Sequence, residues 1–429
     1  MKARSFLSFG APCIEHPPAP PGIHVVESIE ATGPLTLLHP RPGEDRALPA
    51  VKIGDTVKAG QPLALYAGAD YVTVPVTGRV TALRAVNGSY GRRSTAVTIA
   101  ADPDESDASA DEGFAAVAAA PTLAGALAFL AQVPGRPNLG RLADSERPIR
   151  TLVVNAADPD LMVYTNQHVL VTRVHEVRAG IRALRQLTGI EEVYILVRSE
   201  VVQGHGEIEA HFKTVDHRYP SALPPLVMER LFKRTVPAGG APEDLGFCFM
   251  NAEAVASIGA AFASGRVPTV KTLTVIPKDG RPRLARAPIG TPVGRIIEHF
   301  GVTLADGDRV VLGGPMRGEA VPALDDPIEA DTDAVLVVDR AQAAEVSDYP
   351  CINCGDCVRA CPAHLQINLL VRYLEAQKFE EAEESYDLQA CVECGVCSYV
   401  CVAHIPIVQH IRLAKHELQR TRRAEGIDG

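Results

Sequence analysis

The sequence lacks several features that would assign it to a common functional class. Its formal net charge is −10 at pH 7 and no basic run occurs in its body, which argues against nucleic acid as a partner. No Ser-His-Asp order, HExxH motif or Walker loop appears, so hydrolase chemistry has no support. At the N-terminus, MKARSFLSFGAPC is interrupted early by glycine and proline, so we expect no secretory signal.

Long apolar runs are also scarce. The longest, residues 114–133, is rich in alanine and is interrupted by Pro121 and Thr122. A membrane-spanning helix needs about 20 predominantly apolar residues. We therefore interpret this segment as a surface helix that follows a linker, and we expect the chain to have no transmembrane segment of its own. Its 429 residues are enough for roughly two to four domains.

What the sequence does contain is cysteine in a repeated spacing. Eight of its ten cysteines follow CxxCxxCxxxC twice, in CINCGDCVRACP and CVECGVCSYVCV. This run is typical of [4Fe–4S] ligation, and in two-cluster proteins the fourth cysteine of each run ligates the other cluster. We predict two [4Fe–4S] clusters, one held by Cys351, Cys354, Cys357 and Cys401, and the other by Cys391, Cys394, Cys397 and Cys361.

Zinc or a disulfide framework are the alternatives for these thiols. Zinc sites usually combine two CxxC units, and disulfides suit small secreted domains. Val402 stands where the first motif has Pro362, a difference that we expect to alter the turn and leave the ligation intact. Cluster thiols without a signal sequence indicate a reducing cytosol. Cys13 and Cys248 have no partner at metal-binding spacing, and we interpret them as buried free thiols.

Short alternating runs separated by glycine predict β structure over residues 30–100. VKIGDTVKAGQPLALY followed by VTVPVTGRVTAL resembles the barrel-sandwich fold of biotinyl and lipoyl carrier domains. The hairpin tip, where a carrier lysine would stand, reads Gly68, Ala69 and Asp70, so we expect residues 1–100 to be a scaffold domain. An acidic linker, ADPDESDASADEG, and the Ala-rich helix fill residues 101–147.

Residues 148–265 have the pattern of an α/β domain. IRTLVVNA predicts a buried strand, VHEVRAGIRALRQLTG a helix that ends at Gly189, and EEVYILVRS the next strand. Strand, helix and strand at this spacing predict a parallel βαβ unit. Its ligand would lie beyond the carboxyl ends of the strands, near Asn155 and Glu200.

Residues 266–342 return to short strands with turns, in VKTLTVIP, GTPVGRIIEHFG and DGDRVVLGGPMRG, and residues 343–429 hold the cysteine motifs. Between the motifs, LQINLLVRYLEAQKFEEAEES has helical apolar spacing, and a helix there would let the motifs face each other. VQHIRLAKHELQRTRR predicts a C-terminal helix with an apolar face of Ile411, Ala414 and Leu418. We expect this basic helix to dock on a partner or an anionic surface, and a solvated helix end is the alternative.

Three histidines, His364, His404 and His410, lie near the cysteine motifs. A histidine beside a cluster can donate a hydrogen bond to a sulfur and tune the potential. Capping or solvated histidines are commoner, so both interpretations stay open for these residues.

In this order, the parts of the chain resemble the C subunit of the Rnf complex, the membrane-bound ferredoxin:NAD oxidoreductase. The resemblance runs from FGAPCIEHPP through VPAGGAPEDLGFCFMNAEAV, PIGTPV, GGPMRG and LDDPI to the paired motifs and AHIPIVQHIRLAK. It implies a multidomain α/β plus β fold. The implied domains are a barrel-sandwich (lipoyl-like) domain, an α/β domain like the complex I flavoprotein, an SLBB-like β-grasp domain and an α-helical two-cluster ferredoxin domain.

The resemblance also implies a function. The chain would be a peripheral electron-transfer subunit on the cytoplasmic face of the inner or cell membrane, with other subunits of the complex and ferredoxin-like cluster proteins as partners. Two alternatives are a soluble flavin/iron–sulfur reductase similar to the corrin reductases, and a flavin-free electron wire and docking scaffold. A third, a non-redox assembly protein, would leave eight correctly spaced cysteines unexplained.

The sequence departs from the family where flavin would bind. Members carry a loop of the type GxGGAGFPTxxK, whose amides and lysine can hold the flavin phosphate. Here the loop reads VPGRPNLGRLADSERPIR. Only Gly135 and Gly140 remain, its prolines remove amide donors, and Arg136 or Arg141 would have to supply the positive charge.

The acceptors that the resemblance assigns to FMN or NADH are Asn155, Asp158, Asp160 and Glu200. Asn155 and the two acidic positions survive, each acid one methylene shorter than in the family, and an ordinary exposed glutamate after a strand is the alternative for Glu200. Asn166, Gln167 and His168 replace acidic and arginine residues of the family pattern. We therefore expect FMN to be absent or weakly bound and NADH oxidation by this chain to be negligible. An active entry module that binds FMN and NAD(H) stays open as the alternative.

Overall fold

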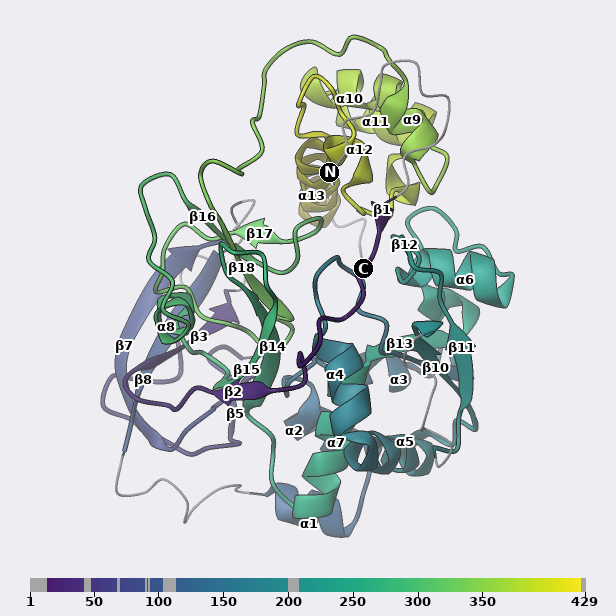
Figure 1. The fold of residues 1–429 in the computed structure, drawn as a ribbon. Helices are drawn as coiled ribbons and strands as arrows, with labels where there is room; N and C mark the ends of the chain where they lie inside the picture. The colour runs from purple at the N-terminus through teal and green to yellow at the C-terminus, as the bar shows by residue number, and fades with distance from the viewer. Residues whose placement is uncertain are drawn as a thin grey trace. The chain divides into compact units, whose positions relative to one another are not determined.

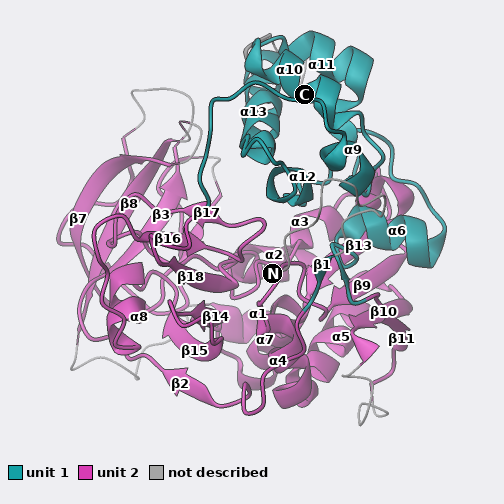
Figure 2. Cartoon of the chain, turned by 45° about the horizontal axis from the view of Figure 1, so that its top comes forward, with its two compact units in different colours: residues 1–16, 217–241, 344–429 teal, residues 17–216, 242–343 magenta. Residues whose placement is uncertain are grey.

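The structure is a computed structural model that describes residues 14–41, 48–67, 70–88, 91, 93–102, 113–199 and 208–425. The chain forms two compact units, which Figure 2 colours separately. The first consists of Met1–His16, His217–Ala241 and Ala344–Gly429, and the second of Pro17–Asp216 and Pro242–Ala343. Most of the predicted acidic linker, together with Cys13, Gly68, Ala69 and Glu200, lies outside the described residues.

A parallel sheet is the centre of the α/β part of the second unit. Its order is β11-β10-β9-β13, and its strands are β9 (Thr151–Asn155), β10 (Glu192–Val197), β11 (His211–Thr214) and β13 (Phe247–Asn251). Strand β9 is buried throughout, as expected for a strand covered on both faces. Helix α5 (Val174–Thr188) ends at Gly189, whose φ is 73°. The predicted strand, helix and parallel strand are thus confirmed.

Helix α5 packs closely on α7 (Ala252–Ser264), which follows β13 (Figure 1). Glycines permit this approach. A Cβ on Gly180 would lie 1.9 Å from the carbonyl oxygen of Val255, and a Cβ on Gly259 would lie 2.0 Å from that of Glu176. The two helices can therefore touch backbone to backbone, and any larger residue at either glycine would push them apart. The shorter α4 (Thr165–Thr172) also contacts α7.

The Ala-rich segment forms two short helices, α1 (Phe114–Ala119) and α2 (Leu123–Leu130), and a third short helix, α3 (Leu139–Leu142), follows it. Pro121 separates the first two because proline cannot continue a helix. Thr122 caps α2 by accepting the N–H of Gly125 at 3.1 Å. Phe114 and Leu130 are fully buried, so the segment belongs to the α/β core and not to the surface.

Two β structures complete the second unit. The predicted β region contains β3 (Leu35–Pro40), β4 (Thr56–Val57), β7 (Gly78–Asn87) and β8 (Arg93–Ala101) in the antiparallel order β3-β8-β7-β4, and the separate pair β5 (Pro62–Leu63) and β6 (Val72–Thr73). A second sheet has the order β17-β16-β18-β14-β15-β2. Its strands are β2 (Val26–Ser28), β14 (Val270–Ile276), β15 (Arg283–Pro288), β16 (Arg309–Leu312), β17 (Glu319–Ala320) and β18 (Ala334–Val338).

One segment of this second sheet region differs from the prediction. GTPVGRIIEHFG, expected among the short strands, forms helix α8 (Val293–His299). Val293, Ile296 and Ile297 are buried at the i, i+3, i+4 spacing of a helix face. This helical spacing of apolar residues was present in the sequence, but the glycine and proline turns on either side made the segment resemble the strands next to it.

The first unit is mostly helical. Its helices are α6 (Pro224–Phe232), α9 (Asp356–Ala360), α10 (Ile367–Glu375), α11 (Phe379–Tyr386), α12 (Val396–Tyr399) and α13 (Ile407–Glu425). A short antiparallel pair, β1 (Ile14–Glu15) and β12 (Arg218–Tyr219), joins two distant segments of the chain. The helical connection predicted between the motifs is present as two helices, and it buries Ile367, Leu370 and Leu374.

The predicted C-terminal helix is confirmed as α13, and its apolar face packs inside the first unit. Ile411, Ala414 and Leu418 are buried in the core of the first unit, and α13 packs against α10, α11 and α12. That face is therefore unavailable for docking elsewhere, and deletion of residues 412–429 would open the core. Among the described helices, none is long and apolar enough to cross a membrane.

Candidate functional site

The two cysteine motifs fold alike. Asn353 and Glu393 hold equivalent positions and have φ values of 58° and 52°. Gly355 and Gly395, two residues later, have φ values of 78° and 77° and start the short helices α9 and α12. Glycine adopts this left-handed conformation without strain. Each motif thus forms the same loop, with its third cysteine on the helix that follows.

The eight thiols line two cavities, four to each. The first cysteine cavity is partly open to solvent, and its cysteines are Cys351, Cys354, Cys357 and Cys401. The second cysteine cavity is also partly open to solvent, and its cysteines are Cys361, Cys391, Cys394 and Cys397. Each cavity takes three thiols from one motif and the fourth from the other, which is the arrangement that crossed ligation requires.

Four thiols around one space fit a [4Fe–4S] cluster, whose four irons each take one thiolate. Within the described residues, no group of three or more His, Cys, Asp or Glu side chains is arranged to hold a single metal ion. Burial raises the pKa of the Cys357 and Cys394 thiols to about 12 and that of Cys391 to about 11. Because the ligand is the thiolate, loading either cavity would release protons from these cysteines.

Polar side chains that the sequence did not point to surround the second cysteine cavity. Lys415 Nζ donates to the carbonyl oxygen of Cys391 at 2.8 Å and lies 3.0 Å from Glu393 Oε1. The hydroxyl of buried Tyr219 donates to the carbonyl oxygen of Cys394 at 2.6 Å. Lys415 lies on the predicted C-terminal helix, where its orientation could be inferred. Tyr219 lies far away in sequence, and no motif marks it.

The three histidines near the motifs act through their backbone. The N–H of His364 donates to the carbonyl oxygen of Cys361 at 3.2 Å, and that of His404 donates to Cys401 at 3.1 Å. Both residues are exposed and have positive φ, so they close equivalent turns. His410 donates its N–H to Pro406 in the first turn of α13. These contacts support the capping interpretation.

The loop before β9 offers few donors to a phosphate. Pro134 and Pro137 have no N–H. Three of the remaining amides are already bonded within the chain: Gly135 N–H to Ala330 O (2.7 Å), Arg136 N–H to Val133 O (2.8 Å) and Leu139 N–H to Pro137 O (2.9 Å). A phosphate needs several such donors at once. These three amides are therefore not available to the phosphate group of FMN.

The same loop is packed against the start of α7. A Cβ on Gly135 would lie only 2.2 Å from the amide nitrogen of Ala254. Asn251 Oδ1 accepts that amide at 2.7 Å, and Asn251 Nδ2 donates to the carbonyl oxygen of Gly135 at 3.1 Å. The N-terminus of α7 is thus capped by its own asparagine, and the loop leaves no room for an anion there.

The two arginines considered as substitutes for the family lysine are placed differently. Arg136 forms ion pairs with Asp331 at 2.8 Å and with Glu329 at 3.0 Å, so two carboxylates already balance its charge. Arg141 is exposed on the four-residue helix α3. Arg136 therefore closes a contact between two segments of the second unit and is not free to meet an added phosphate.

Asn155 and Asp158 hold the backbone after β9. Asn155 Oδ1 accepts the N–H of Ala157 at 3.1 Å. Asp158 accepts the backbone N–H groups of Asn166 at 2.8 Å and Gln167 at 3.0 Å, at the start of α4. Burial raises the pKa of Asp158 to about 7, and these amide bonds act against that rise. Asp158 therefore caps a helix, and Asn166 and Gln167, which replace family residues, supply the capped amides.

Asp160 forms hydrogen bonds to the GGPMRG turn. Its carboxylate accepts the N–H of Met316 at 3.2 Å and of Arg317 at 2.9 Å. Gly314 permits this contact, since a Cβ there would lie 2.4 Å from the Asp160 carboxyl carbon. The turn and the acid were noticed separately in the sequence, and the structure brings them together. Asp160 thus joins β-sheet and α/β segments of the second unit.

A buried ionic network lies beside these residues. Lys271 contacts Glu253, and its Nζ lies 2.9 Å from Asp333 Oδ1. The side chains of Lys271 and Glu253 are fully buried. Burial alone would lower the pKa of Lys271, but the carboxylates of Asp333 and Glu253 outweigh it and raise that pKa above its usual value. Asn166 Oδ1 also accepts the N–H of Glu253 at 3.2 Å, which connects the network to Asp158.

Replacing Lys271 with methionine should destabilise the second unit. It would leave Glu253 and Asp333 without their cation, and removing one partner of a buried pair costs about 3–5 kcal/mol. We expect the midpoint of thermal unfolding to fall by roughly 10 °C. Arg84→Met is the matched control, because Arg84 pairs with Asp325 at 3.2 Å in the same unit and both side chains are more than half exposed. Equal midpoints for the two variants would contradict the assigned role.

Comparison with known families matches two parts of the chain. The Nuo51 FMN-binding domain family matches residues 135–260. The 4Fe-4S dicluster domain family matches residues 350–406, which include both cysteine motifs. The first match contains most of the loop described above, together with Asp158 and Asp160. This region therefore resembles flavin-binding proteins in sequence, although these two side chains are engaged in contacts within the chain.

Several curated relatives match most of the chain. The C subunit of the ion-translocating oxidoreductase complex of Pseudomonas aeruginosa is 32% identical over 88% of this chain and 51% of its own length. That of Rhodobacter capsulatus is 29% identical over 87% and 75%. The C subunit of the Na(+)-translocating ferredoxin:NAD(+) oxidoreductase complex of Acetobacterium woodii is 28% identical over 87% and 88%.

The chain spans about half the length of the Pseudomonas relative. Among solved structures, an NAD+-reducing [NiFe]-hydrogenase in the H2-reduced state aligns with 70% of this chain and 65% of its own, at 14% identity and a TM-score of 0.46, and this likeness supports no argument. The identities of about 30% over most of the chain, together with the two domain matches, carry the assignment. The chain belongs to the family formed by the C subunits of the ion-translocating, Rnf-type oxidoreductase complexes.

Proposed function

We propose that the chain is a peripheral electron-transfer subunit of a membrane-bound Rnf-type ferredoxin:NAD oxidoreductase complex, and that it relays electrons through two [4Fe–4S] clusters. The observation that carries this proposal is the sorting of eight cysteines into two cavities of four. When bound, such clusters take up and release single electrons. The chain's own contribution is to hold four thiolates around each cavity and to shape the charge around them.

The proposed domain layout follows the sequence prediction. Residues 1–100 would be a barrel-sandwich domain, 101–147 a linker with helices, 148–265 the α/β domain, 266–342 an SLBB-like β-grasp domain and 343–429 the ferredoxin domain. The sheet orders and helix α8 support the two β domains. His217–Ala241, inside the α/β range, would be an insertion that packs with the ferredoxin domain, as its grouping in the first unit indicates.

In this proposal the chain binds neither FMN nor NADH tightly. The donors and charges that would hold them are engaged in internal contacts: the loop amides, Arg136, Asn155, Asp158 and Asp160. The match to the Nuo51 FMN-binding domain favours a second candidate, an NADH/FMN entry module or a soluble flavin/iron–sulfur reductase. Flavin content separates the two candidates directly.

The partners and location are inferred from the relatives. Their names identify them as one subunit of a larger complex. We therefore propose that this chain binds other subunits at the cytoplasmic face of the membrane and exchanges electrons with ferredoxin-like cluster proteins. Co-purification with integral membrane subunits after mild detergent extraction tests this placement, and recovery of the chain alone from the soluble fraction would count against it.

Anaerobically purified chain should contain about eight iron and eight sulfide, because each cavity offers four thiols to one cluster. Iron, zinc and sulfide would be measured per chain by elemental and colorimetric analysis. About four iron per chain would mean that only one cavity is loaded. Zinc in place of iron would contradict the electron-transfer proposal altogether.

A further inference from the structure

The two cysteine cavities differ in the charges beside them. At the second cavity, Glu393 lies 3.0 Å from Lys415 Nζ and 3.4 Å from Arg412 Nε, so two cations face one carboxylate. Both cations are largely buried, with side-chain exposures of 19% for Lys415 and 14% for Arg412. The surroundings of this cavity therefore carry a net positive charge in a partly desolvated place.

The first cavity has a balanced and more exposed counterpart. Arg359 Nη1 donates to the carbonyl oxygen of Cys354 at 3.3 Å, and the same guanidinium pairs with Asp356. One cation thus faces one carboxylate, and the Arg359 side chain is 44% exposed. Solvent screens such a pair strongly. The two motifs therefore share their sequence spacing and loop geometry but differ in the charged side chains beside them.

Lys415 is linked directly to the ligand loop. Its Nζ donates to the carbonyl oxygen of Cys391 at 2.8 Å. In the same loop the N–H of Glu393 points to Cys391 Sγ at 3.4 Å. The ammonium group therefore lies next to the first thiolate of the second motif. Tyr219 holds the carbonyl of Cys394 independently, so the loop keeps an anchor when Lys415 is replaced.

We propose that Lys415 raises the reduction potential of the cluster held by Cys391, Cys394, Cys397 and Cys361. Reduction adds one electron to this cluster, and a nearby fixed positive charge stabilises the more negative state. The effect is larger in a partly buried site, where water screens less. Lys415 is thus a positioning and electrostatic residue, and the inference rests on the proposed two-cluster function.

The test compares variants of the full chain in which clusters are monitored by electron paramagnetic resonance during a redox titration. In Lys415→Met, the ratio of reduced to oxidised second cluster at a fixed potential should fall about tenfold, which equals about 59 mV for one electron. The reduction potential of the first cluster should not change. Lys415→Arg keeps the charge and should titrate close to the unchanged chain.

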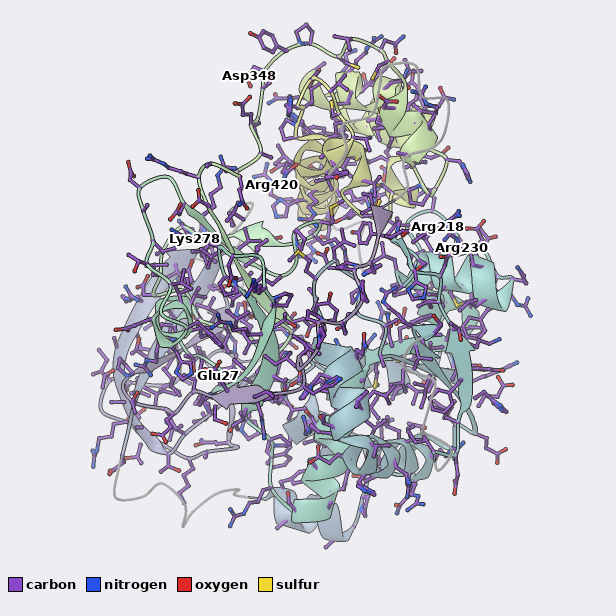
Figure 3. All side chains as sticks on the ribbon, in the orientation of Figure 1. Glu27, Arg218, Arg230, Lys278, Asp348 and Arg420 are labelled. Carbon is purple, nitrogen blue, oxygen red and sulfur yellow. The ribbon has the colours of Figure 1, made fainter. Side chains whose placement is uncertain are left out.

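Arg420→Met is the matched control. Arg420 lies on the same helix, is labelled in Figure 3, pairs with Glu417 and is 72% exposed, so its loss changes net charge without touching the ligand loop. We expect no change in the reduction potential of either cluster in Arg420→Met. Iron content is measured for every variant first. Absence of eight iron in the unchanged chain would refute the two-cluster function, whereas full iron with an unshifted second potential in Lys415→Met would refute this inference alone.

Discussion

Replacing Cys401 with alanine should remove the cluster of the first cysteine cavity and leave that of the second. Cys401 is the last cysteine of the second motif in sequence, but it lines the cavity of Cys351, Cys354 and Cys357. A cubane that loses one of four protein thiolates is left with an open iron and is readily lost. Iron should therefore fall by about half, from eight to about four per chain. Iron analysis together with electron paramagnetic resonance would show which cluster persists.

The reciprocal change, Cys361→Ala, should remove the other cluster, because Cys361 lines the second cavity. Cys248→Ala is the control. Its thiol is buried in the α/β core, outside both cavities, and its loss should leave iron content unchanged. If Cys401→Ala instead abolished the signal of the cluster beside Cys391, Cys394 and Cys397, each motif would serve its own cluster and the crossed assignment would be wrong.

Sequence reasoning succeeded where a short spacing determines a local shape. The cysteine spacing predicts two loops of the same form, and the glycines at 355 and 395 adopt equivalent positive φ values. The apolar spacing of β9 and α5, with Gly189 at the helix end, was equally informative. These patterns are local, so one sequence is enough to read them.

Sequence reasoning failed where distant segments meet. Lys271 is an ordinary lysine in a predicted strand, and only the buried Glu253 that contacts it in the folded chain makes it part of an ionic network. Tyr219 lies 175 residues before Cys394, to whose carbonyl its hydroxyl donates. Asp160 looked like a flavin ligand, yet its partners are the amides of a turn more than 150 residues later. Such pairings depend on tertiary packing that composition and periodicity do not encode.

The segment that matches the FMN-binding domain family illustrates both the success and the failure of sequence reasoning. The loss of the glycine run could be predicted from residues 134–150, because proline removes amide donors wherever it stands. The contacts that the remaining polar residues of this segment make could not be predicted from the sequence. Asp158 keeps the acidic residue type of the family position but caps α4, and Arg136 is a cation in the loop but pairs with Glu329 and Asp331. A residue type expected at a ligand site can thus be present there and make a structural contact instead.

The isolated chain should contain almost no FMN after gentle anaerobic purification and should reduce an artificial acceptor with NADH at a negligible rate. A flavin phosphate carries about two negative charges and needs several donors. Here Gly135, Arg136 and Leu139 have engaged their amides. The fluorescence of added FMN should stay unchanged on titration with the chain, because these three amides and the Arg136 guanidinium are already engaged within the chain.

A double variant, Glu329→Gln with Asp331→Asn, asks whether Arg136 is a hidden phosphate ligand. It removes both carboxylates that pair with Arg136 and frees its guanidinium. Since the loop amides stay bonded and the start of α7 stays capped by Asn251, we expect FMN still not to bind. Stoichiometric FMN with fast NADH oxidation in the unchanged chain would show that the loop opens to admit the cofactor. Binding that appears only in the double variant would instead identify the Arg136 ion pairs as the barrier to flavin.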